Sequence, residues 1–209
     1  ARSGARTAVT TAGIISVQPL LIGLMALSSA AAQSVPARTA AQFALISGSD
    51  TIAVEQVQRD SNEFSAAFDT RGRGRYTLNA KVDPQGLVSR LELSSFAPAG
   101  TTALSHAIVA IVGDSVFAQV GTGVQRTGTK VGAIPWVNPS FALLEILVQR
   151  ARHIGTDSAS IPLFLIQGGS TVMATVVRKG ADSTIVDVAS VALRLHTSVD
   201  GVVLGGVVP

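Results

Sequence analysis

The segment Asn138–Gly155, "NPSFALLEILVQRARHIG", is the one strong helical pattern of this 209-residue chain outside its N-terminal region. Asn138 is a good N-cap residue, and Pro139 suits the first helical position. Gly155 supplies a left-handed stop. Arg150 and Arg152 place positive charge at the C-terminal end of the helix dipole. These signals predict a helix near residues 139–153.

One face of this predicted helix is apolar. Five apolar side chains recur at helical spacing: Phe141, Leu144, Leu147, Val148 and Ala151. A stripe of this kind is buried when a helix packs on a sheet. We therefore expect the helix to rest on one face of a sheet formed by the rest of the chain.

Short β-branched or alternating segments lie on both sides of the helix, and Gly-Asp-Ser turns such as "SGSD" (47–50) and "VGDS" (112–115) separate them. Successive strands with such short connections must be mostly antiparallel. The segment "GTGVQRTG" (121–128) we interpret as a connection between strands. The predicted fold is mainly β: a curved antiparallel sheet or partial barrel packed on one α-helix. This β-rich domain spans residues 42–209, after a linker at residues 33–41.

Composition excludes several classes of function. Hydrophobic residues make up 47% of the chain and charged residues 14%, which is not the composition of a disordered protein. The net charge is +3, but without Arg2 and Arg6 the 16 basic residues become 14 against 13 acidic ones, which gives no basis for binding nucleic acid. Cysteine is absent, so disulfides, thiolate metal sites and thiol nucleophiles are excluded.

The N-terminal region carries no charge from Ala8 to Ala32, a run of 25 residues. A basic start, an apolar core and the small residues Ala30 and Ala32 fit a cleavable secretory signal. The run is also long enough to cross a bilayer, although Pro19 weakens that pattern. Because of the length of this run and the arginines that flank it, Arg2, Arg6 and Arg38, we expect residues 1–32 to be a retained single transmembrane anchor. The start of the chain at Ala1 fits removal of an initiator Met.

Small residues in this segment would let another membrane helix approach closely; they are Gly23, Ala26, Ser28 and Ala30. They equally suit a signal-peptidase site. Arg2 and Arg6 place the N-terminus in the cytoplasm by the positive-inside tendency, so the main domain is expected in the periplasm and the anchor in a bacterial inner membrane.

No motif of the sequence identifies a catalytic, cofactor or metal site. Asp114 and Ser115 superficially resemble the nucleophile block of Gly-Asp-Ser-Leu hydrolases, but no late Asp-x-x-His supplies the base, and we favour a hairpin turn. The histidines His106, His153 and His196 are scattered without ligand spacing. We expect no catalytic residue, cofactor or metal ion.

Three arginines are concentrated in "TRGRGRY" (70–76): Arg71, Arg73 and Arg75. A solvated hairpin tip is the simplest interpretation. The functional alternative is contact with lipid phosphates or with an acidic partner surface.

The order of short strands, "GAIPWVNPSFALLEILVQRA" (132–151) and further strands resembles β-rich periplasmic domains of unknown function in bacterial envelope proteins. The sheet around one helix is also similar to lipoprotein-carrier-like half-barrels. The resemblance covers about residues 42–208 and implies a fold, with no catalytic residue.

Three functions follow as expectations, in this order. The first is a non-catalytic accessory subunit, anchored in the membrane beside other subunits of a larger bacterial complex, such as a photosynthetic reaction-centre–light-harvesting assembly. Because no His lies between Ala8 and Ala32, that role would be structural and not pigment-binding. The second is a secreted half-barrel that binds a lipid or other apolar ligand. The third is a hydrolase that uses Ser115.

Overall fold

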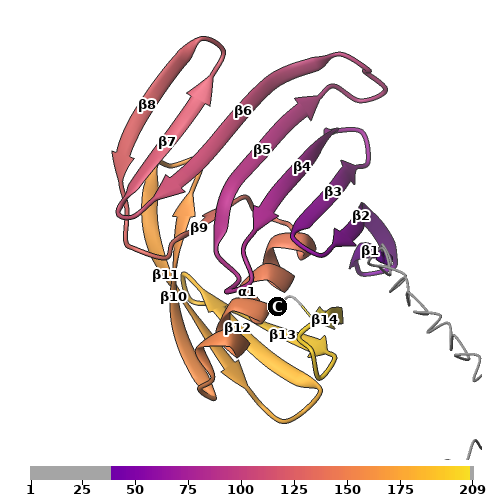
Figure 1. Cartoon of the computed structure of the whole chain (residues 1–209). Coiled ribbons are helices and arrows are strands. Elements are labelled where there is room, and N and C mark those ends of the chain that lie inside the picture. The colour runs from indigo at the N-terminus through magenta and orange to yellow at the C-terminus, as the bar shows by residue number, and fades with distance from the viewer. Residues whose placement is uncertain (1–38, 208–209) are drawn as a thin grey trace, which may run out of the picture. The chain divides into compact units, whose positions relative to one another are not determined.

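Two curved sheets surround the helix α1 (Phe141–Ile154) in the computed structural model, which describes residues 39–207 (Figure 1). These residues belong to one unit, Val35–Pro209. The expected membrane anchor, its packing residues Gly23, Ala26, Ser28 and Ala30, and residues 33–38 of the expected linker lie outside the described residues. The first strand begins at Thr39, inside the segment that we expected to be linker.

The larger sheet is an antiparallel meander of eight strands in chain order. Its strands are β1 (Thr39–Ser47), β2 (Asp50–Asp60), β3 (Glu63–Thr70), β4 (Gly74–Val82), β5 (Val88–Phe96), β6 (Ala103–Val112), β7 (Ser115–Val120) and β8 (Gly123–Gly128). Our interpretation of residues 121–128 as a simple connection was wrong, because β8 pairs with β7 over its whole length. The strand β8 consists mostly of polar residues and Gly and is largely exposed, so its sequence lacks the alternation of apolar residues that marks a half-buried strand.

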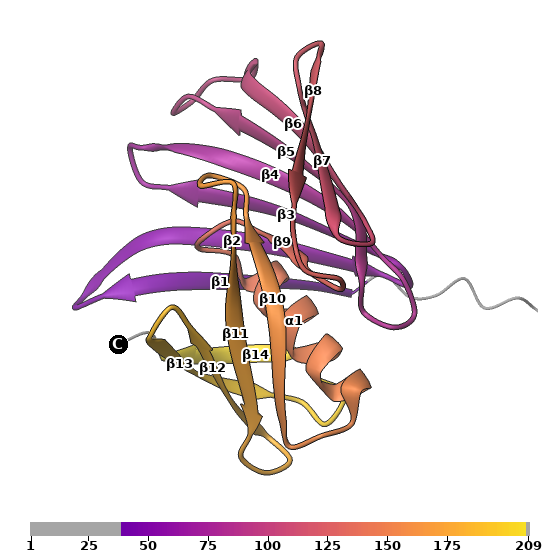
Figure 2. The same cartoon turned by 90° about the vertical axis from the view of Figure 1, so that its left-hand side faces the viewer.

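The smaller sheet has six strands in the order β14-β13-β12-β11-β10-β9. They are β9 (Ile134–Trp136), β10 (Ser158–Leu165), β11 (Ser170–Arg178), β12 (Ser183–Val188), β13 (Val191–Thr197) and β14 (Val203–Val207). All pairs are antiparallel except β9 with β10, because α1 and its loops connect these two strands and return the chain in the same direction. Figure 2 shows that β10 and β11 run across the direction of β1 to β5 of the larger sheet.

The helix begins later than its sequence indicates. Its N-cap is Ser140, whose side chain accepts a hydrogen bond from the backbone N–H of Leu143, so Asn138 is not the cap. Asn138 and Pro139 instead belong to the loop that leads from β9 into α1. Gly155 has φ of 79° and ends the helix in the left-handed conformation, as its position suggests.

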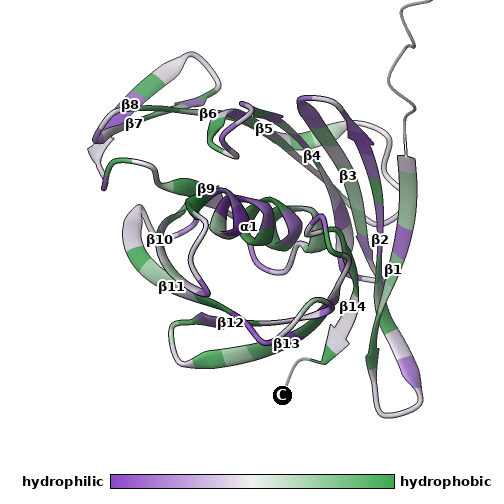
Figure 3. Ribbon diagram, turned by 60° about the horizontal axis from the view of Figure 1, so that its bottom comes forward, coloured by the Kyte–Doolittle hydropathy of each residue, from purple (hydrophilic) through white to green (hydrophobic). Residues whose placement is uncertain are grey.

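The core lies on both sides of α1 and not on one side as we expected. Leu144, Leu147 and Val148 of the predicted stripe are buried, and so are Ala142, Leu143 and Ile146 on the rest of the helix surface. This happens because α1 lies between the two sheets (Figure 3), and buried apolar residues of both sheets belong to the same core as the helix. The prediction of a mainly β fold with curved sheet structure and one helix is confirmed for residues 39–207.

In the part of the chain that the structure describes, no helix combines the length and hydropathy needed to cross a membrane.

Candidate functional site

The loop from β9 to α1 is fixed to the larger sheet by a buried carboxylate. Glu55 of β2 is fully buried and accepts hydrogen bonds from the Ser140 hydroxyl at 2.9 Å and from the backbone N–H groups of Phe141 and Ala142. These N–H groups belong to the first turn of α1, which has no intrahelical partners for them. Glu55 therefore caps the helix from a neighbouring strand.

Aromatic rings surround this carboxylate. Phe43 and Tyr76 lie on the same inner face as Glu55, because β1 to β4 pair in register around it. Phe43 stacks on Phe141 with ring centroids 4.7 Å apart, and Phe68 stacks on Tyr76 at 4.9 Å. The Tyr76 hydroxyl donates to the carbonyl oxygen of Pro139. The loop is thus held from both β2 and β4.

The titration of Glu55 and Tyr76 reflects this environment. Burial raises the pKa of Glu55, and its hydrogen bonds to Phe141, Ser140 and Ala142 offset only part of that effect. Burial also raises the pKa of Tyr76, with a further contribution from the negative charge of Glu55. Neither group has a cationic partner in these contacts, and neither lines a hollow described below, so both serve to hold the loop.

An apolar hollow opens on the inner face of the smaller sheet, next to this loop. We call it the Trp136 hollow. Its volume is about 480 Å³, and it is lined by Trp136, Asn138, Leu165, Gln167, Gly168, Val172, Val188, Ala189, Val191 and Leu193. Most of this lining is apolar, and its side-chain polar groups are the amides of Asn138 and Gln167 and the indole N–H of Trp136.

Strand register explains why these side chains converge. Val172 is opposite Leu163 on β10, and Val188 is opposite both Ala174 and Val191, so alternate residues of β10 to β13 face the same side. Further along the same strands, Ala174 and Val186 are buried. Trp136 is buried, whereas Leu165, Val172, Val188 and Leu193 are half-buried and Val191 is exposed, so they continue the inner face into a more open region. Among residues 39–207, no segment covers this end of the core.

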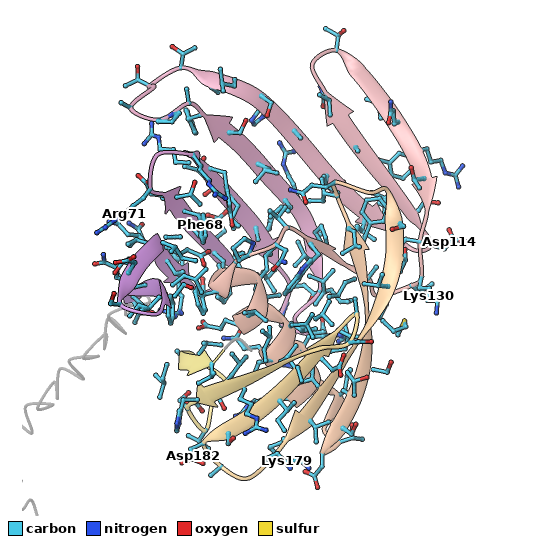
Figure 4. All side chains as sticks on the ribbon, turned by 180° about the vertical axis from the view of Figure 1, so that it is seen from behind. Phe68, Arg71, Asp114, Lys130, Lys179 and Asp182 are labelled. Carbon is cyan, nitrogen blue, oxygen red and sulfur yellow. The ribbon has the colours of Figure 1, made fainter. Side chains whose placement is uncertain are left out.

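A second hollow lies on the other side of the loop, against the larger sheet, and we call it the arginine hollow. Its volume is about 570 Å³, and it is lined by Leu45, Asp50, Thr51, Ile52, Ala53, Phe68, Thr70, Arg71, Arg73 and Pro139. Figure 4 shows Arg71 at its outer rim and Phe68 deeper, toward the helix. Pro139 lines this hollow and Asn138 lines the other, so consecutive residues of the same loop contribute to both.

The structure divides the three arginines that the sequence grouped together. Arg71 and Arg73 line the arginine hollow. Arg75 instead lies over the ring of Phe96, 4.5 Å from its centroid, and donates to the carbonyl oxygen of Gly100 at 3.1 Å. Arg75 is on β4 beyond the turn, where it packs against β5 and the loop that follows it.

A polar cleft of about 570 Å³ lies near the C-terminal end of α1, where Arg152 and His153 meet Asp83 and Asp200. Arg152 donates hydrogen bonds to the carbonyl oxygen of Val199 and to the hydroxyl of Thr197. Its guanidinium therefore holds the loop before β14. Asp83 accepts from the N–H groups of Gln85 and Leu87 within its own turn. These contacts identify Arg152 and Asp83 as supports of loops.

Ser115 lies at the start of β7, immediately after the β6–β7 turn. Its hydroxyl donates to Asp114 at 3.1 Å and accepts from Arg126 at 2.9 Å. His106 lies on β6, where its Nδ1 is 2.9 Å from the Ser94 hydroxyl, while His153 and His196 lie on α1 and β13. Within residues 39–207, no group of three or more His, Cys, Asp or Glu residues is arranged to hold a metal ion.

Comparisons with known proteins show the fold alone. The structure resembles the crystal structure, at 1.80 Å resolution, of a DUF1089 family protein from Pseudomonas aeruginosa, with a TM-score of 0.56 and 14% sequence identity. The match covers 79% of this chain and 94% of that chain. No protein-family model matches the sequence, and no curated protein matches it. The neighbour supports the resemblance to a β-rich domain of unknown function but not to lipoprotein carriers.

Sequence reasoning missed the residues that build the loop and the Trp136 hollow. Glu55 sits in an alternating strand, and nothing in "TIAVEQVQ" (51–58) marks it as the cap of a helix that starts 86 residues later. Trp136 had a usable signal, since the one Trp of the chain stands just before the predicted helix. The side chains Val172, Val188 and Leu193 carried no signal beyond ordinary strand alternation.

Proposed function

We propose that this domain is a non-catalytic binding protein for a small amphiphile, whose alkyl chain occupies the Trp136 hollow. The observation that carries the proposal is the uncovered apolar end of the inner face around Trp136, Leu165 and Leu193. Sites for small ligands are concave, mostly apolar and about 300–1,000 Å³ in volume, with a few polar groups that fix orientation. The hollow, at about 480 Å³, has these features.

Energetics support an alkyl chain as the occupant. Each buried methylene contributes about 0.8 kcal/mol, so ten of them would contribute about 8 kcal/mol before the cost of association. A linear chain also suits a hollow bounded by strands, because it can lie along the row of Val, Leu and Trp side chains. The amides of Asn138 and Gln167 can accept or donate hydrogen bonds to the polar end of the ligand.

The proposal is tested with glycerol monolaurate as the probe and Trp136 fluorescence as the readout, since Trp136 is the one Trp of the chain. We expect the fluorescence of Trp136 to change in a saturable way as the ligand is added, with a micromolar dissociation constant. The variant Val191→Asp places a charge in the hollow and should weaken binding by at least about tenfold. Val191 is 46% exposed, so the variant should still fold.

The matched control is Val124→Asp on β8, where Val124 is 63% exposed and lies outside both hollows. It should leave binding unchanged. The proposal fails if monolaurate gives no saturable signal, or if the two variants weaken binding equally.

The second candidate is the membrane-anchored accessory subunit of a larger bacterial membrane complex. The uncharged run from Ala8 to Ala32 favours it. It is compatible with the first candidate, because an anchored domain can also bind a lipid. The inner-membrane location, the periplasmic orientation, the non-enzymatic character and the link to a reaction-centre–light-harvesting assembly stay predictions. Mass spectrometry of the protein from membranes tests the anchor, and a mature chain starting at Gln33 would exclude it.

A further inference from the structure

We propose that Arg71 and Arg73 bind the anionic head group, a carboxylate or a phosphate, of an amphiphile whose alkyl chain lies in the Trp136 hollow. The proposal rests on the proposed function and adds the chemical class of the ligand. The two hollows share one loop, with Asn138 lining one hollow and Pro139 the other. An amphiphile that crosses this loop can place its two chemically different ends in two chemically different hollows.

The turn that carries the arginines is held in a fixed shape. The Thr70 hydroxyl donates to the carbonyl oxygen of Gly74 at 2.6 Å, and the N–H of Arg73 donates to the carbonyl oxygen of Thr70 at 3.0 Å. The N–H of Arg71 donates to the carbonyl oxygen of Ile52 at 3.3 Å, which ties the turn to β2. The two arginine side chains therefore start from ordered backbone positions, which lowers the entropy lost when they bind an anion.

Within residues 39–207, neither guanidinium makes a hydrogen bond or an ion pair that would hold the fold. The ion pairs of the described residues join Arg59 to Glu145, Arg90 to Glu92 and Arg178 to Asp157, and neither Arg71 nor Arg73 takes part. Four further arginines hold loops or lie over aromatic rings: Arg75, Arg126, Arg150 and Arg152. Arg71 and Arg73 thus remain available, and a guanidinium matches the geometry of a carboxylate or phosphate with paired N–H donors.

The rest of the lining favours the head group of an amphiphile over a fully hydrated ion. Beneath the arginines lie the apolar side chains of Leu45, Phe68 and Pro139, beside the hydroxyls of Thr51 and Thr70. Asp50 also lines the hollow, so the two positive charges face one negative charge there. The net positive charge of the hollow still favours an anionic ligand. Its apolar side chains favour an anion that is attached to a hydrocarbon chain.

Two ligands with the same 12-carbon chain test the inference: dodecyl phosphate, which is anionic, and glycerol monolaurate, which is neutral. Both are titrated against the full chain by calorimetry and by Trp136 fluorescence. In the double variant Arg71→Gln/Arg73→Gln, dodecyl phosphate should bind at least about tenfold more weakly, and monolaurate should bind within about twofold of the unmodified protein.

The matched control is Arg194→Gln/Lys179→Gln, which removes the same charge from two exposed positions outside both hollows. It should leave both affinities unchanged. The inference is overturned if the control weakens dodecyl phosphate equally, or if the arginine variant leaves it unchanged. It is also overturned if inorganic phosphate alone binds as tightly as dodecyl phosphate, since the site would then take a free anion. Failure of monolaurate to bind the unmodified protein would instead reject the proposed function.

Discussion

Glu145 of α1 and Arg59 of β2 form a two-pronged ion pair in the interior, with Arg59 Nη2 2.8 Å from Glu145 Oε2 and Arg59 Nε bound to Oε1. The same carboxylate accepts the backbone N–H of Val203 of β14 at 2.9 Å. One side chain of the helix therefore connects the larger sheet to the smaller one. The Glu145 side chain is 1% exposed, so water cannot replace these hydrogen bonds.

Replacing Glu145 should strongly destabilise the domain. Glu145→Ala leaves the Arg59 guanidinium buried without its partner and the Val203 N–H without an acceptor, so the free energy of unfolding should fall by about 3–5 kcal/mol. Urea unfolding followed by Trp136 fluorescence measures this. The control is Asp157→Ala, which removes an exposed ion pair with Arg178 and should cost less than about 1 kcal/mol. Equal effects of the two variants would show that the interior pair has no special role.

The sequence predicts elements whose signals are local. Gly155 ends the helix where expected, and most strands follow runs of alternating residues. The N-cap was misplaced because Asn138 and Ser140 are both good caps, and the choice depends on Glu55 and Tyr76, which lie far away in the chain. The strand β9 was missed because it is only three residues long and is paired solely with β10.

The candidate site was less predictable because it depends on register between distant segments. The sequence drew attention to Arg71, Arg73 and Arg75 together, yet only the fold shows that Arg75 packs on Phe96 while the other two line a hollow. The Trp136 hollow is lined mostly by ordinary strand residues that no other segment of residues 39–207 covers. Such an absence of cover has no local sequence signal.

Glu55 should make stability depend on pH. Since burial raises the pKa of Glu55 above its ordinary value of 4.5, the folded protein binds this proton more tightly than the unfolded chain. The contribution of Glu55 to stability is therefore fully present below pH 4.5 and is lost as the pH rises through the raised pKa of the folded state. Gln at this position cannot ionise and should lack this dependence.

Urea unfolding of the unmodified protein and of Glu55→Gln, between about pH 4 and about pH 8, checks this expectation. The stability difference should shift in favour of the Gln variant as the pH rises. Glu63→Gln, at an exposed position of β3, is the matched control for the loss of one carboxyl group. If the difference in unfolding free energy between the two proteins stays constant, or favours the unmodified protein more as the pH rises, the pKa of Glu55 is not raised in the folded state.

Gly74 should be required for the turn that carries Arg71 and Arg73. Its φ is 111°, and a Cβ at this position would lie 2.7 Å from the carbonyl oxygen of Phe96. Gly74→Ala should lower the free energy of unfolding by about 2–4 kcal/mol, because both the backbone and the neighbouring strand must adjust.

The control for Gly74 is Gly123→Ala in β8, where the nearest atom to a new Cβ is the Val120 carbonyl oxygen at 3.8 Å. This change should alter stability by less than about 1 kcal/mol. Thermal unfolding of both variants makes the comparison. A Gly74 variant as stable as the Gly123 variant would mean that the turn can relax at little cost.

The central claim, that an alkyl chain occupies the hollow beside Trp136, is tested most directly by a monoglyceride with a bromine atom at the end of its 12-carbon chain. Bromine quenches indole fluorescence only at close range, and Trp136 lines the hollow. We expect the brominated ligand to quench Trp136 fluorescence in a saturable way. Val191→Asp should weaken this quenching, and Val124→Asp should leave it unchanged. Binding of the brominated ligand, measured by equilibrium dialysis, without any quenching of Trp136 would contradict it.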